Sequence, residues 1–412
     1  MILLGGVRVT DRTGTTVAAN PAPYRNIALL ALAQAMLMSG TSVLIATSAL
    51  VGRALADNPA LATIPLGLQF MAMTAAAIPA SLFMGRYGRR PGFLIGASLG
   101  LLGTLLAGLA VWSQSFALFC VAAVLIGVYN GSGQFYRFAA ADVAPVERRA
   151  RAISLVLAGG IVAGFMGPNL AAWTRTLLGP DFTASYLVLA GLYLVGMAAI
   201  SALRIPLPPK QVLNDPGRPL RQIAAQPTFM VALAAATVGY GVMNLLMVAT
   251  PLSMEAHDHA FDDAAFVIQW HVLAMFVPSF FTGELVRRFG LLTVLGTGVV
   301  LMLACVAVHF SGHGVWHYWS GLVLLGVGWN FLFIGGTTLL TEAYAESEKA
   351  RSQAFNDFVV FGTVTLTALG SGALLSTFGW VLLNLMVVPF LIAVLVGLLW
   401  LHRLRRRQLQ EA

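Results

Sequence analysis

Long apolar segments alternate with short polar ones along almost the whole chain. About twelve of these segments approach the roughly 20 residues that an α-helix needs to cross the hydrocarbon core of a membrane. Their approximate boundaries are 26–52, 63–84, 92–112, 117–141, 152–173, 184–203, 228–253, 264–286, 291–310, 319–343, 355–377 and 380–402. The pattern predicts an all-α membrane protein with twelve transmembrane helices, and the even number places both termini on one side of the membrane.

The composition agrees with a membrane protein and excludes several other classes. Of the 412 residues, 58% are hydrophobic and only 10% are charged, which is typical of a polytopic membrane protein rather than a soluble enzyme. The two cysteines, Cys120 and Cys305, both lie in apolar segments, so we expect no disulfide framework. The sequence contains no nucleophile–base arrangement and no phosphate-binding loop, and we expect neither enzymatic activity nor a cofactor.

Basic residues predict the orientation in the membrane. If the amino terminus is cytoplasmic, Arg53 and Arg175 are the only basic residues in external loops. The others lie in internal loops, in the tails or, for Arg137, within the fourth helix. This asymmetry follows the positive-inside rule, so both termini are predicted to be cytoplasmic. It also explains the net charge of +8 by contact with anionic membrane lipid, without a nucleic-acid partner.

A polar, proline-rich segment divides the predicted helices six and six. The predicted parts are a cytoplasmic tail (1–25), an N-terminal six-helix bundle (26–206), a cytoplasmic linker (207–226), a C-terminal six-helix bundle (227–402) and a basic cytoplasmic tail (403–412). The halves contain two pairs of similar segments, Arg86-Tyr87-Gly88 with Arg288-Phe289-Gly290 and Glu147–Ala152 with Ser347–Ser352. We therefore expect two repeated halves with a substrate path between them.

Two motifs in the seventh and eighth helices contain metal-binding side chains. Met243 and Met247 are four residues apart, as are His271 and Met275, so each pair lies on one face of its helix. A short polar loop separates the helices, and an antiparallel hairpin would place the two pairs at similar depths. Thioether sulfur favours Cu(I), and imidazole also suits copper. The four side chains predict a copper site, and the alternative is that the methionines fill an apolar core.

Five further histidines lie on the predicted external side. They are His257, His259, His309, His313 and His317. The last three are spaced four and four, so in a continuous helix they would share one face and could pass a metal ion inward. The alternative is that they belong, with the neighbouring Trp316 and Tyr318, to an anchor at the membrane interface.

A second candidate site would suit an organic cargo. Arg137 is the one basic residue within a predicted helix, and we expect it to pair with Asp142 or Glu342 or to extend towards the lipid headgroups. These two carboxylates and Asp357 fall near cytoplasmic helix ends, so proton coupling is either absent or runs through His271. The residues to test for an organic substrate or for gating are Asn130, Gln134, Tyr136, Arg137, Trp329 and Asn330.

The loop after the second helix carries a family resemblance. The segment Gly85–Arg90 resembles the cytoplasmic loop between helices two and three of the major facilitator superfamily. The residues concerned are Gly85, Arg86, Gly88, Arg89 and Arg90. The resemblance implies the superfamily fold and a conformational role for this loop, although Gly85 stands where the family usually has aspartate. Ala123 stands near the place of an arginine that proton-driven drug exporters carry, which argues against that activity.

Within that superfamily, the motifs of helices seven and eight resemble those of the CcoA-like copper importers. The resemblance implies copper as the transported substrate, moved by alternating access across the inner membrane of a bacterium. The imported copper would serve assembly of a haem–copper oxidase such as the cbb3 type, and a cytoplasmic copper-accepting protein would be a partner. The wider group is similar to riboflavin transporters, so import of a small organic substrate such as riboflavin is the alternative. Efflux of a lipophilic compound is a further one.

Overall fold

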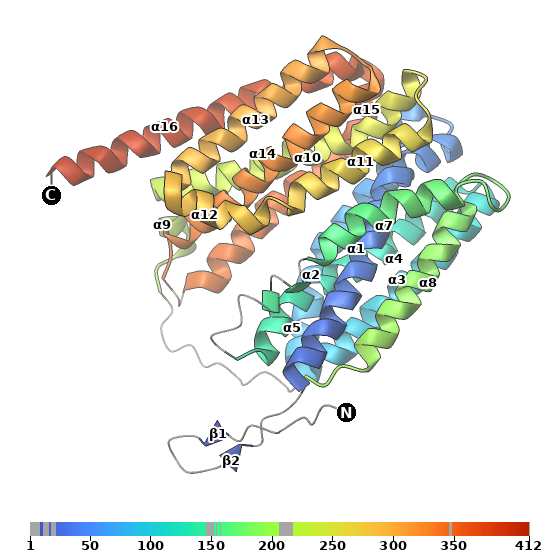
Figure 1. Ribbon diagram of the computed structural model, residues 1–412, viewed down its shortest axis with the longest axis horizontal. Coiled ribbons are helices and arrows are strands. Elements are labelled where there is room, and N and C mark those ends of the chain that lie inside the picture. Colours follow the sequence, from blue (N-terminus) through green and yellow to red (C-terminus); the bar gives the residue numbers. More distant parts are fainter. Residues whose placement is uncertain are drawn as a thin grey trace, which may run out of the picture.

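The chain folds into two bundles of α-helices that lie side by side (Figure 1). The computed structural model describes residues 9–10, 16–17, 22–145, 152–153, 155–156, 158–205, 217–345 and 348–411. The N-terminal bundle contains α1 (Ala22–Leu55), α2 (Ile64–Tyr87), α3 (Arg89–Trp112), α4 (Phe116–Gly133), α5 (Tyr136–Val143), α7 (Gly159–Thr174) and α8 (Thr183–Ser201). The C-terminal bundle contains α9 (Leu220–Ala224), α10 (Pro227–Ala256), α11 (Phe261–Phe276), α12 (Ser279–Phe289), α13 (Leu291–Ser311), α14 (Val315–Thr341), α15 (Lys349–Met386) and α16 (Val388–Glu411). The remaining elements are a short 3-10 helix, η1 (Pro59–Leu61), and the antiparallel strands β1 (Val9–Thr10) and β2 (Thr16–Val17).

The two ends of the double bundle carry different connections. The start of α1, the end of α16 and the residues flanking the segment between the bundles lie at one end, called the linker end below (Figure 1). The connections α1–α2, α3–α4, α7–α8, α10–α11 and α13–α14 lie at the opposite end, called the far end. The first and last helices thus begin and end on one side, which agrees with an even number of crossings. The cytoplasmic location of that side stays a prediction.

Helix length and composition are those of a membrane-spanning protein. Within the described residues, nine helical stretches are long and apolar enough to cross a membrane, or ten if α11 and α12, which meet at 46°, form one bent span. The stretch Arg351–Gln408 is counted as one of the nine. Gly379, with a φ of 71°, interrupts it at the boundary predicted between the last two helices. Helix α7 has 16 residues, too few to be included. The total of twelve stays a prediction.

The two bundles repeat one turn in detail. Gly88 (φ 96°) lies between α2 and α3, and Gly290 (φ 86°) lies between α12 and α13. In each turn the glycine N–H donates to a carbonyl four residues earlier, that of Met84 or Val286. A positive φ favours glycine, because a Cβ there would strain the backbone. The two Arg-aromatic-Gly segments that look alike in the sequence therefore adopt the same turn.

The predicted domain boundaries show local differences from the observed helices. Helix α1 begins at Ala22, inside the predicted tail 1–25, and α9 lies inside the predicted linker 207–226. Helix α16 continues to Glu411, so the predicted basic tail is helical over nearly all its length. Of the second pair of similar sequence segments, Glu147–Arg151 and Ser347 lie outside the described residues, as does 206–216.

Two helix pairs make the most extensive contacts between the bundles, α2 with α15 and α7 with α11. Each pair joins the second span of one half to the fifth span of the other, as the twofold repeat requires. Gly67 of α2 faces Leu369 of α15, and Gly164 of α7 faces Val272 and Leu273 of α11. Small residues of this kind allow the backbones of membrane helices to approach closely.

A similar approach holds α4 against α2 within the N-terminal bundle. Gly127 and Gly131 lie against the backbone carbonyls of Gln69 and Met73. A Cβ at Gly127 would lie 2.3 Å from the Gln69 carbonyl oxygen, which a backbone atom cannot avoid by rotation. The distance between these two helices therefore depends on the glycines.

Gly127→Ala should destabilise the protein, because overpacking against backbone costs about 1–3 kcal/mol. The apparent melting temperature of the purified protein in detergent should fall by several degrees. Gly191→Ala is the control, since a Cβ there has nothing within 4 Å. Equal melting temperatures for the two variants would contradict a packing role for Gly127.

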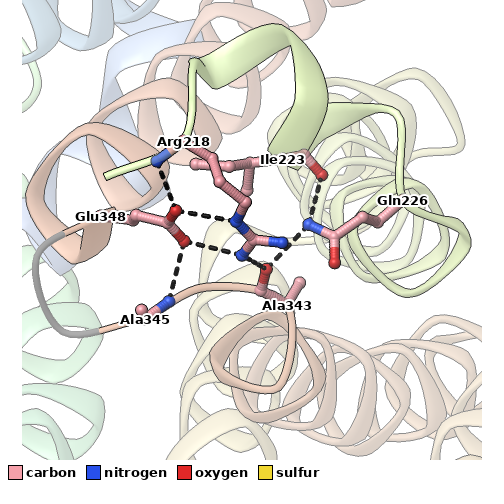
Figure 2. Close-up of polar contacts among 6 residues, drawn as sticks. All are labelled: Arg218, Ile223, Gln226, Ala343, Ala345 and Glu348. Carbon is pink, nitrogen blue, oxygen red and sulfur yellow. Dashed lines mark hydrogen bonds and ion pairs between the residues drawn. The ribbon is translucent and has the colours of Figure 1, made fainter. Parts of the chain in front are cut away.

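At the linker end, one ion pair fastens the segment before α9 to the α14–α15 connection (Figure 2). The Arg218 guanidinium donates to the two carboxylate oxygens of Glu348 at 2.8 and 2.7 Å, and the N–H groups of Arg218 and Ala345 donate to the same carboxylate. The side chains of Arg218 and Gln226 both donate to the Ala343 carbonyl. The hydrogen bonds from Arg218, followed by that from the Ala345 N–H, hold the pKa of Glu348 well below its usual range.

Glu348→Gln should lower the apparent melting temperature at pH 7.5. The glutamine amide has no negative charge and only one acceptor oxygen, so it cannot accept all of the hydrogen bonds that the carboxylate accepts. A carboxyl whose pKa is depressed by folding stabilises the protein above its ordinary pKa of about 4.3 and loses this contribution as the pH falls. The difference between wild type and variant should therefore shrink on acidification below about pH 4.3. Glu284→Gln, which removes an exposed i,i+3 pair with Arg287, is the control and should have little effect at either pH.

Candidate functional site

An aromatic cluster in the C-terminal bundle lies next to the junction of the two bundles. Trp329 of α14 stacks on Phe333, with ring centroids 5.1 Å apart and planes at 11°. Tyr240 of α10 lies 5.3 Å from Trp329 and 5.9 Å from Phe361 of α15. Phe276 of α11, 6.2 Å from Trp329, lies against α7 of the other bundle. The indole Nε1 of Trp329 is buried and has no protein partner.

The N-terminal bundle carries buried polar atoms without protein partners. Within the described residues they include both amide atoms of Gln69, Oδ1 of Asn130 and Nε of Arg137. The buried hydroxyl of Tyr136 interacts with that of Tyr129. The side chain of Gln134 has a weak contact, 4.0 Å from a methionine sulfur. A buried polar group without a partner lowers stability, so donors and acceptors of this kind suit a site that binds a polar ligand.

Arg137 lies within electrostatic range of the aromatic cluster. Its charge interacts with Asp357 of α15 and with Tyr240 of α10, both in the C-terminal bundle. Its guanidinium lies 4.9 Å from the centre of the Phe138 ring. Sequence reasoning did not include Tyr240 or connect Asp357 with Arg137. The sequence contained one indication of such an interaction, Arg137 itself, because a cation inside an apolar helix usually pairs with a polar or anionic group on a neighbouring helix.

The expected pairing of Arg137 with Asp142 or Glu342 is wrong, because other arginines engage both carboxylates. Arg89 at the start of α3 holds Asp142 of α5 at 3.0 Å, and Arg405 of α16 holds Glu342 at 2.7 Å. The first of these pairs places Arg89 of the predicted conformational loop in contact with the end of the fourth span.

The other predicted loop residues have separate environments. The Arg86 guanidinium lies 5.4 Å from the centre of the Tyr87 ring. Gly85 has open space where a side chain would project, and Arg90 is exposed. Gly88 forms the turn itself.

Asn330 has a structural position at the break between α11 and α12. Its amide nitrogen donates to the Met275 carbonyl and to Ser279 Oγ, both at 2.7 Å, and its oxygen accepts from Thr282 at 2.6 Å. The side chain is fully buried and its hydrogen bonds are made within the protein. We therefore assign Asn330 to the support of the bent span, while Trp329 beside it belongs to the aromatic cluster.

The two predicted copper motifs do not lie on a pair of helices that face each other closely. Helix α14 packs extensively on both α10 and α11, whereas α10 and α11 contact each other over few residues. Met243, Met247 and Met275 are buried in one hydrophobic core. The His271 ring uses Nδ1 for a 2.8 Å hydrogen bond to the Leu322 carbonyl of α14. Its Nε2 is buried and has no protein partner.

The five histidines predicted to be external gather at the far end without forming a helical face. Helix α13 ends and α14 begins between His309 and His317, and an extended Gly312 (φ 170°) separates them. The expected common face of His309, His313 and His317 is therefore wrong, because the chain is not one helix there. His257 and His259 approach His313 from the α10–α11 connection. Among the described residues, no three His, Cys, Asp or Glu side chains are arranged to hold a metal ion.

A cavity of about 410 Å³ lies at the far end, away from the aromatic cluster, and both bundles line it. Beside it, Phe182 of the N-terminal bundle packs edge to face on Phe261 of α11, with centroids 4.9 Å apart. Arg53 of α1 forms an ion pair with Glu255 of α10 at 3.0 Å. These contacts join the bundles at the far end.

Comparison with known proteins identifies the family. The family model of the Major Facilitator Superfamily matches residues 30–268 and again residues 231–412. The chain is 40% identical over 382 residues to the riboflavin transporter RfnT of Brucella anthropi, an alignment that covers 92% of this chain and 96% of that protein. It is 27% identical to YdeG and to YddS, two uncharacterized MFS-type transporters of Bacillus subtilis, over 85% of this chain and 84% of each relative.

The chain therefore belongs to the major facilitator superfamily. It is a transport protein rather than an enzyme, and a multi-pass protein of the bacterial inner membrane. None of the three relatives above is named as a copper transporter, so the resemblance to copper importers gains no support from them.

Proposed function

We propose that this chain imports riboflavin, or a closely similar flavin, through a site between the two bundles. The observation that carries the proposal is the aromatic cluster around Trp329, together with buried polar side chains of the N-terminal bundle that have no protein partner. One of these, Arg137, lies within electrostatic range of Tyr240 in the cluster. The name of the relative RfnT, whose alignment includes nearly the whole chain, supports the same cargo.

The chemistry of a flavin fits the two sets of side chains. Its isoalloxazine ring is planar and aromatic, and offset stacking on Trp329 or Tyr240 would stabilise it. The ring carbonyls and ribityl hydroxyls need hydrogen-bond partners, which Gln69, Asn130 and Arg137 could supply. Riboflavin is uncharged at neutral pH, so the interaction between Arg137 and Asp357 could remain while the cargo is bound.

Copper import is a second candidate, supported by one observation. The buried Nε2 of His271 has no protein partner, and Met243, Met247 and Met275 belong to the surrounding core. Soft thioethers and a neutral imidazole are suitable Cu(I) ligands. A cytoplasmic copper-accepting protein is a partner only under this second candidate.

Trp329→Ala should raise the KM for riboflavin uptake about tenfold, because loss of an aromatic contact and of buried area costs roughly 1.4 kcal/mol. The measurement is the initial rate of labelled riboflavin uptake, normalised to the amount of protein in the membrane. Trp316→Ala, at a tryptophan that is 69% exposed at the far end, is the control and should leave KM unchanged. A wild-type KM in Trp329→Ala would exclude the aromatic cluster as the binding site.

Replacing Met243, Met247 and Met275 together by leucine should leave riboflavin uptake within about twofold of wild type, because leucine keeps the size and apolarity of methionine but removes sulfur. Copper accumulation should also be unchanged. Measuring both cargoes in the same cells separates the two candidates. If wild type accumulates copper and the triple variant does not, copper import replaces riboflavin import as the proposed function.

A further inference from the structure

The far end of the C-terminal bundle holds five of the seven histidines of the chain. Two of them form a stacked pair: the rings of His257, after α10, and His313, before α14, have centroids 4.2 Å apart and planes at 18°. The lone pairs of imidazole nitrogens lie in the ring planes, so two stacked rings do not direct them at one metal ion. The stack instead joins the α10–α11 connection to the α13–α14 connection.

Hydrogen bonds keep both connections in place while the rings are neutral. His257 Nδ1 lies 2.7 Å from the Ser253 carbonyl, so this nitrogen carries the hydrogen and donates it. The Tyr318 hydroxyl lies 2.7 Å from Ser253 Oγ and 3.2 Å from His257 Nδ1. His259 Nε2 donates to the His313 carbonyl at 2.6 Å. None of these four hydrogen bonds requires a positive charge on a ring.

The surroundings of His313 disfavour a positive charge on its ring. The titratable or charged side chains near it are His259, His309, His317, Tyr318, Arg53, Glu255 and the exposed Asp258. Arg53 lines a cavity of about 280 Å³ together with His257, and it already engages Glu255 in an ion pair. Partial burial, followed by the neighbouring His257 and His317, lowers the pKa of His313.

We propose that the His257–His313 stack is a proton-sensitive latch at the far end of the C-terminal bundle. Protonation of both rings places two positive charges side by side, and their repulsion separates the two connections. Glu255 lies two residues before His257, so opening of the latch also loosens the ion pair that joins α10 to Arg53 of the N-terminal bundle. The far end is predicted to face the outside, so external acidity favours its opening. This property goes beyond the proposed cargo and holds whatever is transported.

The direction of the pH effect follows from linkage. His313, whose pKa is lowered in the stack, stabilises the stack above the ordinary histidine pKa of about 6.5. This contribution is lost as the pH falls below that value. At pH 5.5 the loss of this contribution weakens the closed latch by up to about tenfold relative to pH 7.5.

Hydrogen–deuterium exchange of the full-length protein in lipid nanodiscs tests the latch without any cargo. After correction for the intrinsic pH dependence of exchange, protection of residues 253–262 and 311–318 should fall by up to about tenfold between pH 7.5 and 5.5. Protection of α3 serves as the internal reference. The double variant His257→Gln/His313→Gln keeps hydrogen-bonding side chains that do not titrate, so its protection should be independent of pH. His402→Gln, at an exposed histidine of α16, should behave as wild type.

Two results would overturn the latch. One is a wild-type protein whose two connections have the same protection at both pH values. The other is a double variant that keeps the wild-type pH dependence. If the double variant is poorly protected at both pH values, the single variants decide: each should show a smaller pH effect than wild type, and an undiminished effect in both rejects the proposal. Riboflavin uptake does not enter this measurement, so its failure would leave the latch untouched.

Discussion

The hydrocarbon around the helices is the constraint on which the rest of this structure depends. Backbone polar groups inside a membrane must be bonded within the protein, so every break in a helix needs a local partner. Asn330 supplies that partner where α11 gives way to α12, by donating to the Met275 carbonyl and accepting from Thr282. One buried amide thus stabilises a bend of 46°. The residue before it in α14, Trp329, lies in the aromatic cluster, so the bend and the candidate site depend on the same turn of helix.

The same constraint explains how the two bundles meet. Lipid chains are as apolar as leucine side chains, so close packing rather than a hydrophobic driving force associates membrane helices. Gly67 against α15 and Gly164 against α11 provide this packing at the two main contacts. A 2.5 Å hydrogen bond between Asn169 and Gln269 adds a polar contact to the second. Two related contacts between rigid bundles suit a protein whose halves rotate against each other.

Much of this fold could be predicted from hydrophobic spacing and charge. The predicted boundary between the last two helices coincides with Gly379, and the two Arg-aromatic-Gly segments are equivalent helix junctions. The breaks near Gln134 and Pro278 were not predicted, because hydrophobicity continues across them. Spacing within the chain also predicted a helical face for three histidines, and that expectation failed at Gly312, whose extended backbone ends the helix.

The candidate site was predicted less well, for a physical reason. A period of four places Met243 and Met247 on one helical face, but it does not say which helix that face meets. Helices consecutive in the chain need not pack on each other. An antiparallel hairpin would place α10 against α11, but each of them packs mainly on α14 instead. Arg137 presents the same difficulty. Its charge indicated that an oppositely charged group lies nearby, but the sequence did not show which residue that is. The groups within electrostatic range of Arg137 are Asp357 of α15 and Tyr240 of α10, both in the other bundle, and spacing along one helix gives no information about such neighbours.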